Sequence, residues 1–414
     1  RDTDRSRGLG DVYKRQKKKT LILAVLVIGL LLPSCSNNSN DMMSSVIEKG
    51  LKRSIEQSEF MAASLMDQPD RLPKTTEKDG TLVTSDTHWW CSGFFSGTLW
   101  MLYEATGNET LKKYAENYTM RIEKEQYALD THDLGFMMNC SFGNGYRITG
   151  NENYKKILLQ SARSLATRYN ENIGVIRSWD NKPKWMYPVI IDNLMNLELL
   201  ENAYKLSQDS LFDKIANSHA TITITNHFRP DYSSCHVVDY DTITNKALKM
   251  DTHQGYSSTS AWARGQAWGL YGYTMMYRET QNEKYLQQAI NIAKFILHHP
   301  NLPEDKIPYW DFDAPNIPDE PRDASAGAII ASALLELGQY VNDDKLSKEY
   351  QSVAAQQLRT LSSDEYLAAP QTNGGFILKH SVGNKPRNSE VDAPLTYADY
   401  YYVEALLRYK KLLQ

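Results

Sequence analysis

The chain has 414 residues, 41% of them hydrophobic, and a formal charge of −4. Binding to a nucleic acid backbone needs clustered positive charge, so this balance argues against a nucleic acid partner. The unusual feature is the aromatic content, with 26 Tyr and 8 Trp. These side chains combine a flat apolar face with a polar edge, which suits a sugar ring, although many will be core residues.

The N-terminal region predicts an export signal at residues 17–35. Lys17-Lys18-Lys19 precede an apolar run, Leu21–Leu32, that is too short to span a membrane. The run ends in Leu32-Pro33-Ser34-Cys35, which resembles a bacterial lipoprotein signal. Cys35 would then carry the lipid and residues 36–43 would form a tether. We expect an exported lipoprotein that faces the periplasm and meets the membrane only through this anchor.

Residues 1–16 precede the basic segment and contain no initiator methionine, so we interpret them as a spurious extension. Beyond Cys35 the chain holds Cys91, Cys140 and Cys235. Three widely spaced cysteines without a CxxC pair argue against a disulfide framework and a zinc site. We expect small buried side chains there, and neither a metal nor a cofactor.

From residue 44 onward, amphipathic stretches alternate with short polar turns. A tyrosine ends one stretch, and an Asn or Asp a few residues later starts the next, which predicts a helix stop followed by an N-cap. These turns lie at Tyr103–Asn108, Tyr146–Asn151, Tyr204–Asp209, Tyr277–Asn282 and Tyr340–Asp344. The pattern therefore predicts helical hairpins.

Twelve stretches have a helical period. They are 44–66, 92–104, 109–126, 134–147, 152–169, 188–205, 210–226, 258–279, 283–298, 324–340, 345–361 and 395–413. Twelve paired helices can close into an inner and an outer ring of six, so we predict an all-α protein with one (α/α)6 barrel domain at 44–414. An open solenoid is the alternative, but the turn tyrosines recur irregularly, 43 to 73 residues apart.

Five longer loops separate the pairs and are the candidate walls of a site. They are 67–90, 170–187, 227–257, 300–323 and 362–394.

Asp192 is the first candidate catalytic residue, because it stands alone in the apolar run Trp185–Leu197. Burial of an ionised acid is costly unless it is paired, and favours the neutral form, so Asp192 is a candidate proton donor. The alternative is a cap of a helix that begins at Asn193, or a bond to a buried backbone amide.

Asp133 is the second candidate, and it also precedes an apolar helix, where a helix cap is the simpler interpretation. Asp133 opens the fourth predicted helix and Asp192 lies near the start of the sixth, so both belong to the even-numbered helices that would form one ring. Two carboxylates at one cavity, one neutral and one ionised, meet the needs of acid and base chemistry on a sugar.

Arg264 and Trp268 are four residues apart and share a helical face. A guanidinium there could hold a carboxylate while the indole covers the ring beside it. A cation stacked on an indole is also common on plain surfaces. The small residues around this pair favour a cavity for an anionic sugar.

Five segments together resemble the unsaturated glucuronyl hydrolases of glycoside hydrolase family 88. They are Trp90–Gly97, His132–Phe136, Ile191–Asn196, Ser260–Gly269 and Tyr397–Tyr401. The resemblance implies an (α/α)6 barrel without a metal. It also implies release of a 4,5-unsaturated uronic acid from the non-reducing end of chondroitin-, hyaluronan- or heparin-type oligosaccharides made by lyases.

The resemblance assigns Asp192 as the catalytic acid/base and Asp133 as the second essential acid. It implies that Asp192 protonates C4 of the enol ether, that water adds at C5, and that the hemiketal then collapses. Sugar contacts are implied for His236, Gln254, Arg264, Trp268, Trp90, His132 and Tyr397. The family leads us to expect an acidic residue in the segment Trp89–Ser92, and this sequence differs from that form.

The loop 379–387 carries several groups suited to an anion, namely Lys379, Ser381, Lys385 and Arg387. We predict that it meets a sulfate on the second sugar. A solvated basic loop is the alternative.

Two other functions are compatible with much of this pattern. One is an unsaturated rhamnogalacturonyl hydrolase acting on pectin fragments, although the segment Ala263–Trp268 differs from its pattern. The other is a glycan-binding lipoprotein without catalysis. Retention of both acids argues against a binding protein, which gains nothing from burying them.

Overall fold

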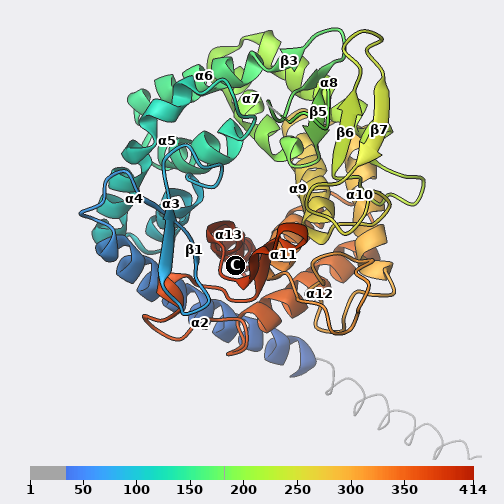
Figure 1. Ribbon diagram of the computed structural model, residues 1–414. Coiled ribbons are helices and arrows are strands. Elements are labelled where there is room, and N and C mark those ends of the chain that lie inside the picture. The colour runs from blue at the N-terminus through green and yellow to red at the C-terminus, as the bar shows by residue number, and fades with distance from the viewer. Residues whose placement is uncertain (1–33, 181) are drawn as a thin grey trace, which may run out of the picture.

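The computed structural model describes residues 34–180 and 182–414, with the backbone alone for 34–40. The predicted signal and the extension before it lie outside the described residues. Within the described part, helices form two concentric rings around a common axis (Figure 1). The (α/α)6 barrel predicted from the sequence is therefore confirmed.

The inner ring closes because its last helix packs against its first. Its members are α3 (Phe94–Thr106), the π-helix η2 (Gly135–Gly143) continued by α5 (Asn144–Thr149), α7 (Asn193–Ser207), α9 (Ala263–Thr280), α11 (Ala324–Leu337) and α13 (Thr396–Leu412). The outer ring consists of α2 (Ser34–Ser64), α4 (Glu109–Arg121), α6 (Glu152–Ala166), α8 (Ser210–His227), α10 (Glu283–His298) and α12 (Asp344–Leu361). The inner helices are the even-numbered ones of the sequence pattern, as predicted.

The hairpin turns follow the predicted chemistry. The residue after each of the first four inner helices is left-handed and donates its N–H to the carbonyl of the predicted tyrosine, as Gly107 does to Tyr103. The Asn or Asp that follows caps the next helix, as Asn108 does by accepting the N–H of Thr110. The fifth turn differs because α11 already ends at Leu337, although Asp343 still caps α12.

Short antiparallel strands occupy the long loops. The pairs are β1 (Leu72–Thr76) with β2 (Leu82–Ser85), β3 (Tyr169–Asn170) with β4 (Val175–Ile176), and β8 (Ser381–Asn384) with β9 (Ser389–Ala393). A three-stranded sheet is formed by β5 (Pro188–Ile190), β6 (Val237–Tyr240) and β7 (Ala247–Asp251). Short 3-10 segments are η1 (Glu123–Tyr127), η3 (Asn373–Gly375) and η4 (Lys385–Arg387).

Several element boundaries differ from the prediction: α9, for example, begins at Ala263 instead of 258, and three other differences lie near the site or the N-terminal end of the described chain. The stretch 188–190 is a strand, because Pro188 lacks the N–H of a helix interior and the β-branched Val189 and Ile190 favour a strand. The helix that opens at Asp133 begins as a π-helix, and the side chain of Asn196 on α7 accepts the N–H of Phe136 at 2.8 Å, one of the first-turn N–H groups that have no partner within the helix. The helix α2 reaches back through the expected tether, since extending a formed helix is easier than nucleating one.

The barrel buries three cysteines. Cys91, Cys140 and Cys235 are free and buried, as predicted. In residues 34–180 and 182–414, every helix is too short or too polar to span a membrane.

Candidate functional site

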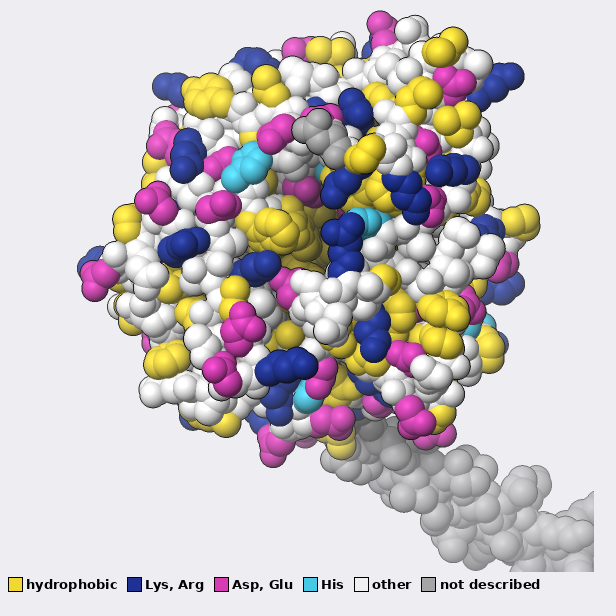
Figure 2. All heavy atoms as spheres, viewed as in Figure 1, with side chains coloured by type: hydrophobic (Ala, Val, Ile, Leu, Met, Phe, Trp, Pro, Cys, Tyr) yellow, Lys and Arg dark blue, Asp and Glu magenta, His cyan; other side chains and the backbone are white. Residues whose placement is uncertain are grey.

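The site lies where the inner helices begin. Asp192 directly precedes α7, Arg264 lies in the first turn of α9, and Tyr397 lies in the first turn of α13. The cavity between these ends is lined by Trp90, His132, Asp133, Phe136, Trp179, Ile190, Asp192, Gln254 and Arg264. A hollow opens at the centre of this face (Figure 2).

The carboxylate of Asp192 points into this cavity rather than onto its own helix. The residue is 7% exposed and occupies the N-cap position of α7, but its side chain accepts no hydrogen bond from the helix. Its Oδ1 lies 3.5 Å from Nε2 of His236 and makes no hydrogen bond within the described residues. The capping alternative thus fits the position of Asp192 but not its bonding.

The bonds of His236 fix the proton on its ring. Nδ1 accepts the backbone N–H groups of His253 at 3.0 Å and Gln254 at 3.1 Å, so it carries no proton. The hydrogen of the neutral ring then lies on Nε2, the atom that faces Asp192. His236 therefore presents a donor to Asp192, whereas the sugar contact that the resemblance implied for it stays a prediction, since His236 is not among the residues that line the cavity.

The second acid is held beside a buried histidine. Asp133 Oδ1 lies 3.3 Å from Nε2 of His132, and its Oδ2 accepts the hydroxyl of Thr131 at 3.0 Å. Burial raises the pKa of Asp133 above the usual aspartate range, and the charge of Asp192 adds to this rise. Burial lowers the pKa of His132, which is therefore neutral near pH 7. The two acids face one cavity.

An aromatic wall borders the acids. Trp90 packs on Tyr397 with ring centroids 4.9 Å apart and on Phe136 at 5.4 Å. Trp179 lies across from them, 5.1 Å from the ring of His253. The hydroxyl of Tyr397, behind this wall, is buried and makes no hydrogen bond within the described part of the chain.

The structure places Arg264 differently from the prediction of a free carboxylate clamp. Its Nη1 donates to Oδ2 of Asp323 at 3.0 Å and to the carbonyl of Val382, and its Nη2 donates to the carbonyl of Gly383 at 2.6 Å. Gln254 donates to the same Gly383 carbonyl at 3.2 Å. Arg264 lines the cavity, but its guanidinium also ties α9 to α11 and β8.

Trp268 is not a sugar-contacting residue in this structure. Its side chain is 0% exposed and packs behind the wall, 5.1 Å from Phe136 and 5.5 Å from Tyr401. The spacing of four residues puts Trp268 one full turn deeper into the inner ring than Arg264, so the indole fills the core instead of facing the cavity.

The four residues of the predicted sulfate loop lie in different surroundings. Lys385 and Arg387 lie in η4 at the turn between β8 and β9, and the charge of Arg387 acts on His253 beside the cavity. Ser381 is fully buried in β8. Lys379 instead donates to the carbonyl of Asp364 at 3.0 Å and lines a separate groove, so the structure does not support Lys379 as a sulfate contact.

Two further site residues were missed by the sequence reasoning. Trp179 lies in a loop predicted as a site wall, and a tryptophan in such a loop was the available signal. Asp323 caps α11 through Ser325 and is the counterion of Arg264. A lone acid directly before the apolar run that begins at Ala324 could have indicated it.

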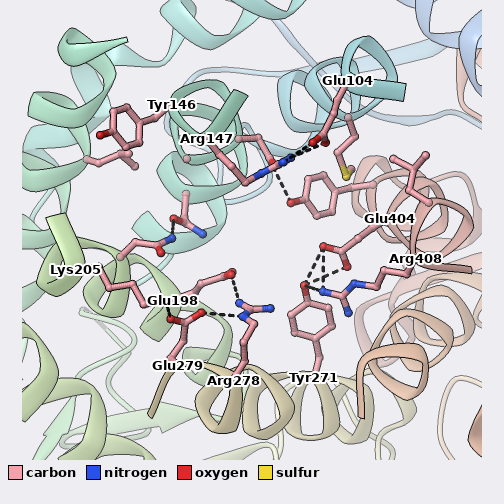
Figure 3. A pocket seen from close by; sticks show the side chains of 18 of the residues that line it. Glu104, Tyr146, Arg147, Glu198, Lys205, Tyr271, Arg278, Glu279, Glu404 and Arg408 are labelled. Carbon is pink, nitrogen blue, oxygen red and sulfur yellow. Dashed lines mark hydrogen bonds and ion pairs between the residues drawn. The ribbon is translucent and has the colours of Figure 1, made fainter. Parts of the chain in front are cut away.

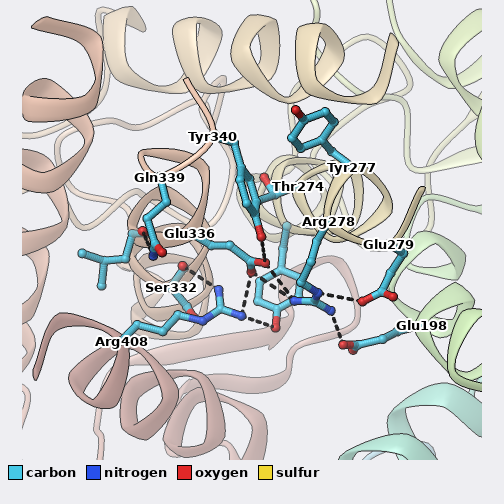
Figure 4. A network of polar contacts seen from close by, with 12 residues as sticks. Glu198, Thr274, Tyr277, Arg278, Glu279, Ser332, Glu336, Gln339, Tyr340 and Arg408 are labelled. Carbon is cyan, nitrogen blue, oxygen red and sulfur yellow. Dashed lines mark hydrogen bonds and ion pairs between the residues drawn. The ribbon is translucent and has the colours of Figure 1, made fainter. Parts of the chain in front are cut away.

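A larger cavity, about 600 Å³, lies where the inner helices end (Figure 3). Its central charges are paired: Arg147 binds Glu104 at 2.6 and 2.8 Å, and Tyr271 donates to Glu404 at 3.0 Å. Behind them, Glu336 accepts from Arg278 at 2.9 Å and pairs with Arg408 at 2.8 Å (Figure 4). Such closed networks join helices. The smaller cavity, where Oδ1 of Asp192 and the ring nitrogens of His132 have no hydrogen-bond partner among the described residues, is the better candidate for chemistry.

Comparisons with known proteins agree with this geometry. Residues 61–411 match the sequence profile of Glycosyl Hydrolase Family 88. The unsaturated glucuronyl hydrolase of Formosa agariphila is 44% identical over 401 residues, which cover 95% of this chain and 99% of that protein. The unsaturated chondroitin disaccharide hydrolase of Streptococcus pneumoniae is 34% identical, with 82% and 86% covered.

A crystal structure of an unsaturated glucuronyl hydrolase specific for heparin superposes with a TM-score of 0.86 at 50% identity, covering 89% of this chain and 98% of that one. The enzyme from Bacillus sp. GL1 gives a TM-score of 0.82 at 30% identity, with 88% and 97% covered. The matched sequence and the matched fold span the same domain, including both acids and the aromatic wall. The chain belongs to glycosyl hydrolase family 88.

Proposed function

We propose that this enzyme removes the 4,5-unsaturated uronic acid from the non-reducing end of lyase-generated glycosaminoglycan oligosaccharides. The observation that carries this proposal is the pair of acids, Asp192 and Asp133, at one cavity that His132 also lines, with Oδ1 of Asp192 and both ring nitrogens of His132 lacking a hydrogen-bond partner among the described residues. Loss of absorbance at 235 nm, where the conjugated double bond absorbs, measures the reaction on unsaturated disaccharides. Absence of turnover on a panel of chondroitin, hyaluronan and heparin disaccharides would contradict the proposal.

The proposed chemistry is hydration of an enol ether. Asp192 gives its proton to C4, and positive charge then develops at C5 and the ring oxygen. Water adds to C5 and loses a proton, which returns the acid to its starting state. The resulting hemiketal opens to a C5 ketone and a hemiacetal at C1, which releases the rest of the oligosaccharide as an alcohol.

The surrounding residues support these steps through position and polarity. The Nε2–H of His236 faces Asp192 and can hold its carboxylate after the proton has left. Asp133 with His132 provides polar groups for the ring hydroxyls, and the Trp90 wall gives an apolar face for the sugar. A substrate that fills the cavity also displaces water from the acids, which strengthens these interactions.

We expect the turn between β8 and β9 to select sulfated substrates through Lys385 and Arg387. Replacing both by alanine should lower kcat/KM on a sulfated disaccharide several-fold, because each rim cation contributes about 1 kcal/mol or less. The loss should shrink at high salt, and an unsulfated disaccharide should change less. Lys379→Ala is the matched control. An unchanged ratio between sulfated and unsulfated substrates in the double variant would remove this loop from sulfate recognition.

The proposal extends to the location of the enzyme. The basic and apolar segments before Cys35 support export followed by lipid attachment at that cysteine, with the barrel facing the periplasm. In a bacterial host, the full chain should fractionate with membranes and the Cys35→Ser variant should not. Equal recovery of both in the membrane fraction would contradict lipidation at this residue.

A further inference from the structure

Trp89 presents an exposed indole next to the catalytic cavity. The residue is 41% exposed, whereas its neighbour Trp90 is half-buried and lines the cavity. Among the described residues, the ring of Trp89 packs on no other aromatic ring, while Trp90 contacts three of them. Within the same residues, no side chain or carbonyl accepts the indole N–H of Trp89. A large aromatic face and a free donor are thus offered at the surface.

The backbone that carries this indole is fixed. Oδ1 of Asp86 accepts the N–H groups of His88 and Trp89, each at 3.1 Å. The hydroxyl of Thr87 donates to Glu125 at 2.5 Å, and Nδ1 of His88 lies 2.8 Å from the same carboxylate. Because this segment is already ordered, a ligand that stacks on Trp89 would lose little affinity to loop ordering.

Contacts link Trp89 to the cavity wall. Nζ of Lys74 on β1 lies 4.5 Å from the centroid of the Trp89 ring and 3.3 Å from Oε1 of Glu390 on β9. Glu390 lies against Gly383, whose carbonyl accepts from the cavity residues Arg264 and Gln254. The indole and the ammonium therefore lie at the rim on the side of the β8–β9 hairpin.

We propose that Trp89 and Lys74 bind a sugar beyond the first two of a longer oligosaccharide, a contact that a disaccharide does not reach. The inference rests on the proposed function. Trp90 rather than Trp89 lines the cavity that takes the cleaved uronate, so Trp89 is left for a part of the substrate that leaves over the rim. The C–H face of a pyranose stacks on an indole. In glycosaminoglycans the third sugar is a uronate, whose carboxylate suits an ammonium group.

The test compares an unsaturated disaccharide with a tetrasaccharide of the same repeating unit. Trp89→Ala should raise KM for the tetrasaccharide about three- to tenfold, the size expected for loss of one aromatic contact, and leave KM for the disaccharide within about twofold. Trp89→Phe should give a KM for the tetrasaccharide between those of Trp89→Ala and the wild type. Tyr127→Ala, which removes a 64% exposed ring in η1, is the matched control and should change neither value.

Two results would overturn the inference: equal losses on both substrates, or no loss on the tetrasaccharide. Failure of the proposed function gives a different result, because the wild type would then turn over neither substrate. Calorimetric titration of tetrasaccharide into Asp192→Asn with and without Trp89→Ala measures the contact without turnover. The added Trp89→Ala substitution should raise the Kd for the tetrasaccharide by the same factor of about three to ten.

Discussion

The Asp192→Asn variant is expected to lose at least about a hundredfold in kcat while keeping its fold and its affinity for the disaccharide. The amide has nearly the same shape as the acid but cannot give a proton to C4, and general acids contribute on the order of a hundredfold or more. The side chain makes no hydrogen bond within the described residues, so the substitution breaks little structure. Initial rates at 235 nm give kcat, and calorimetric titration with the disaccharide gives the affinity.

Asp239→Asn is the matched control for a buried carboxylate without a catalytic role. Asp239 is 3% exposed, and its Oδ1 accepts the N–H of Tyr187 at 2.8 Å. Because the amide of asparagine keeps an acceptor for this N–H, the variant should keep both its fold and its kcat. If Asp192→Asn retained more than about a tenth of the wild-type rate, Asp192 would not be the main proton donor.

The Asp323→Ala variant is expected to lose about 3–5 kcal/mol of unfolding free energy, because the Arg264 guanidinium is left buried without its counterion. The two side chains are 0% and 1% exposed, and Nη1 lies 3.0 Å from Oδ2. The N-cap of α11 is lost as well. Urea unfolding measures the change, which should appear as a lower midpoint with an unchanged slope.

An exposed ion pair serves as the comparison for the buried pair of Arg264 and Asp323. Arg147 and Glu104 are also bound closely, but their side chains are 50% and 40% exposed, so Glu104→Ala should cost less than about 1 kcal/mol. Asp323→Asn keeps an acceptor for the cap and should fall between the wild type and Asp323→Ala. If Asp323→Ala and Glu104→Ala lost equally little unfolding free energy, the Arg264–Asp323 ion pair would not be needed to hold the inner helices and β8 together.

The fold could be predicted because its signals are local. Each hairpin turn combines a tyrosine, a left-handed stop and a capping Asn or Asp, and these features act within six residues. The five long loops were also identified as walls, and loop residues such as Trp179, His236 and Gln254 do meet at the site. Both acids could be found because a carboxylate is costly to bury in an apolar run, so an isolated one stands out as a candidate for chemistry.

The parts that could not be predicted depend on contacts between distant segments. The N–H of Phe136, in the first turn of the π-helix, is accepted by the side chain of Asn196, sixty residues later. The counterion of Arg264 comes from Asp323 on another inner helix, and Lys379 turns toward a carbonyl at Asp364. Helical spacing put Trp268 and Arg264 on one face, but only the ring of helices decides which turn of that face borders the cavity. Here Trp268 lies in the core.

Deuterium incorporation tests the central claim, hydration of the enol ether through protonation of C4 by an acid fixed in the enzyme, most directly. The wild type would turn over an unsaturated disaccharide in D2O, and the product would be examined by NMR before exchange next to the new ketone. We predict one deuterium at C4 in a single stereochemical position, formed as the 235 nm absorbance falls, because an acid fixed before α7 delivers it from one face of the ring. Deuterium spread equally over both C4 positions, or a released sugar that keeps its double bond, would contradict enzymatic hydration of the enol ether.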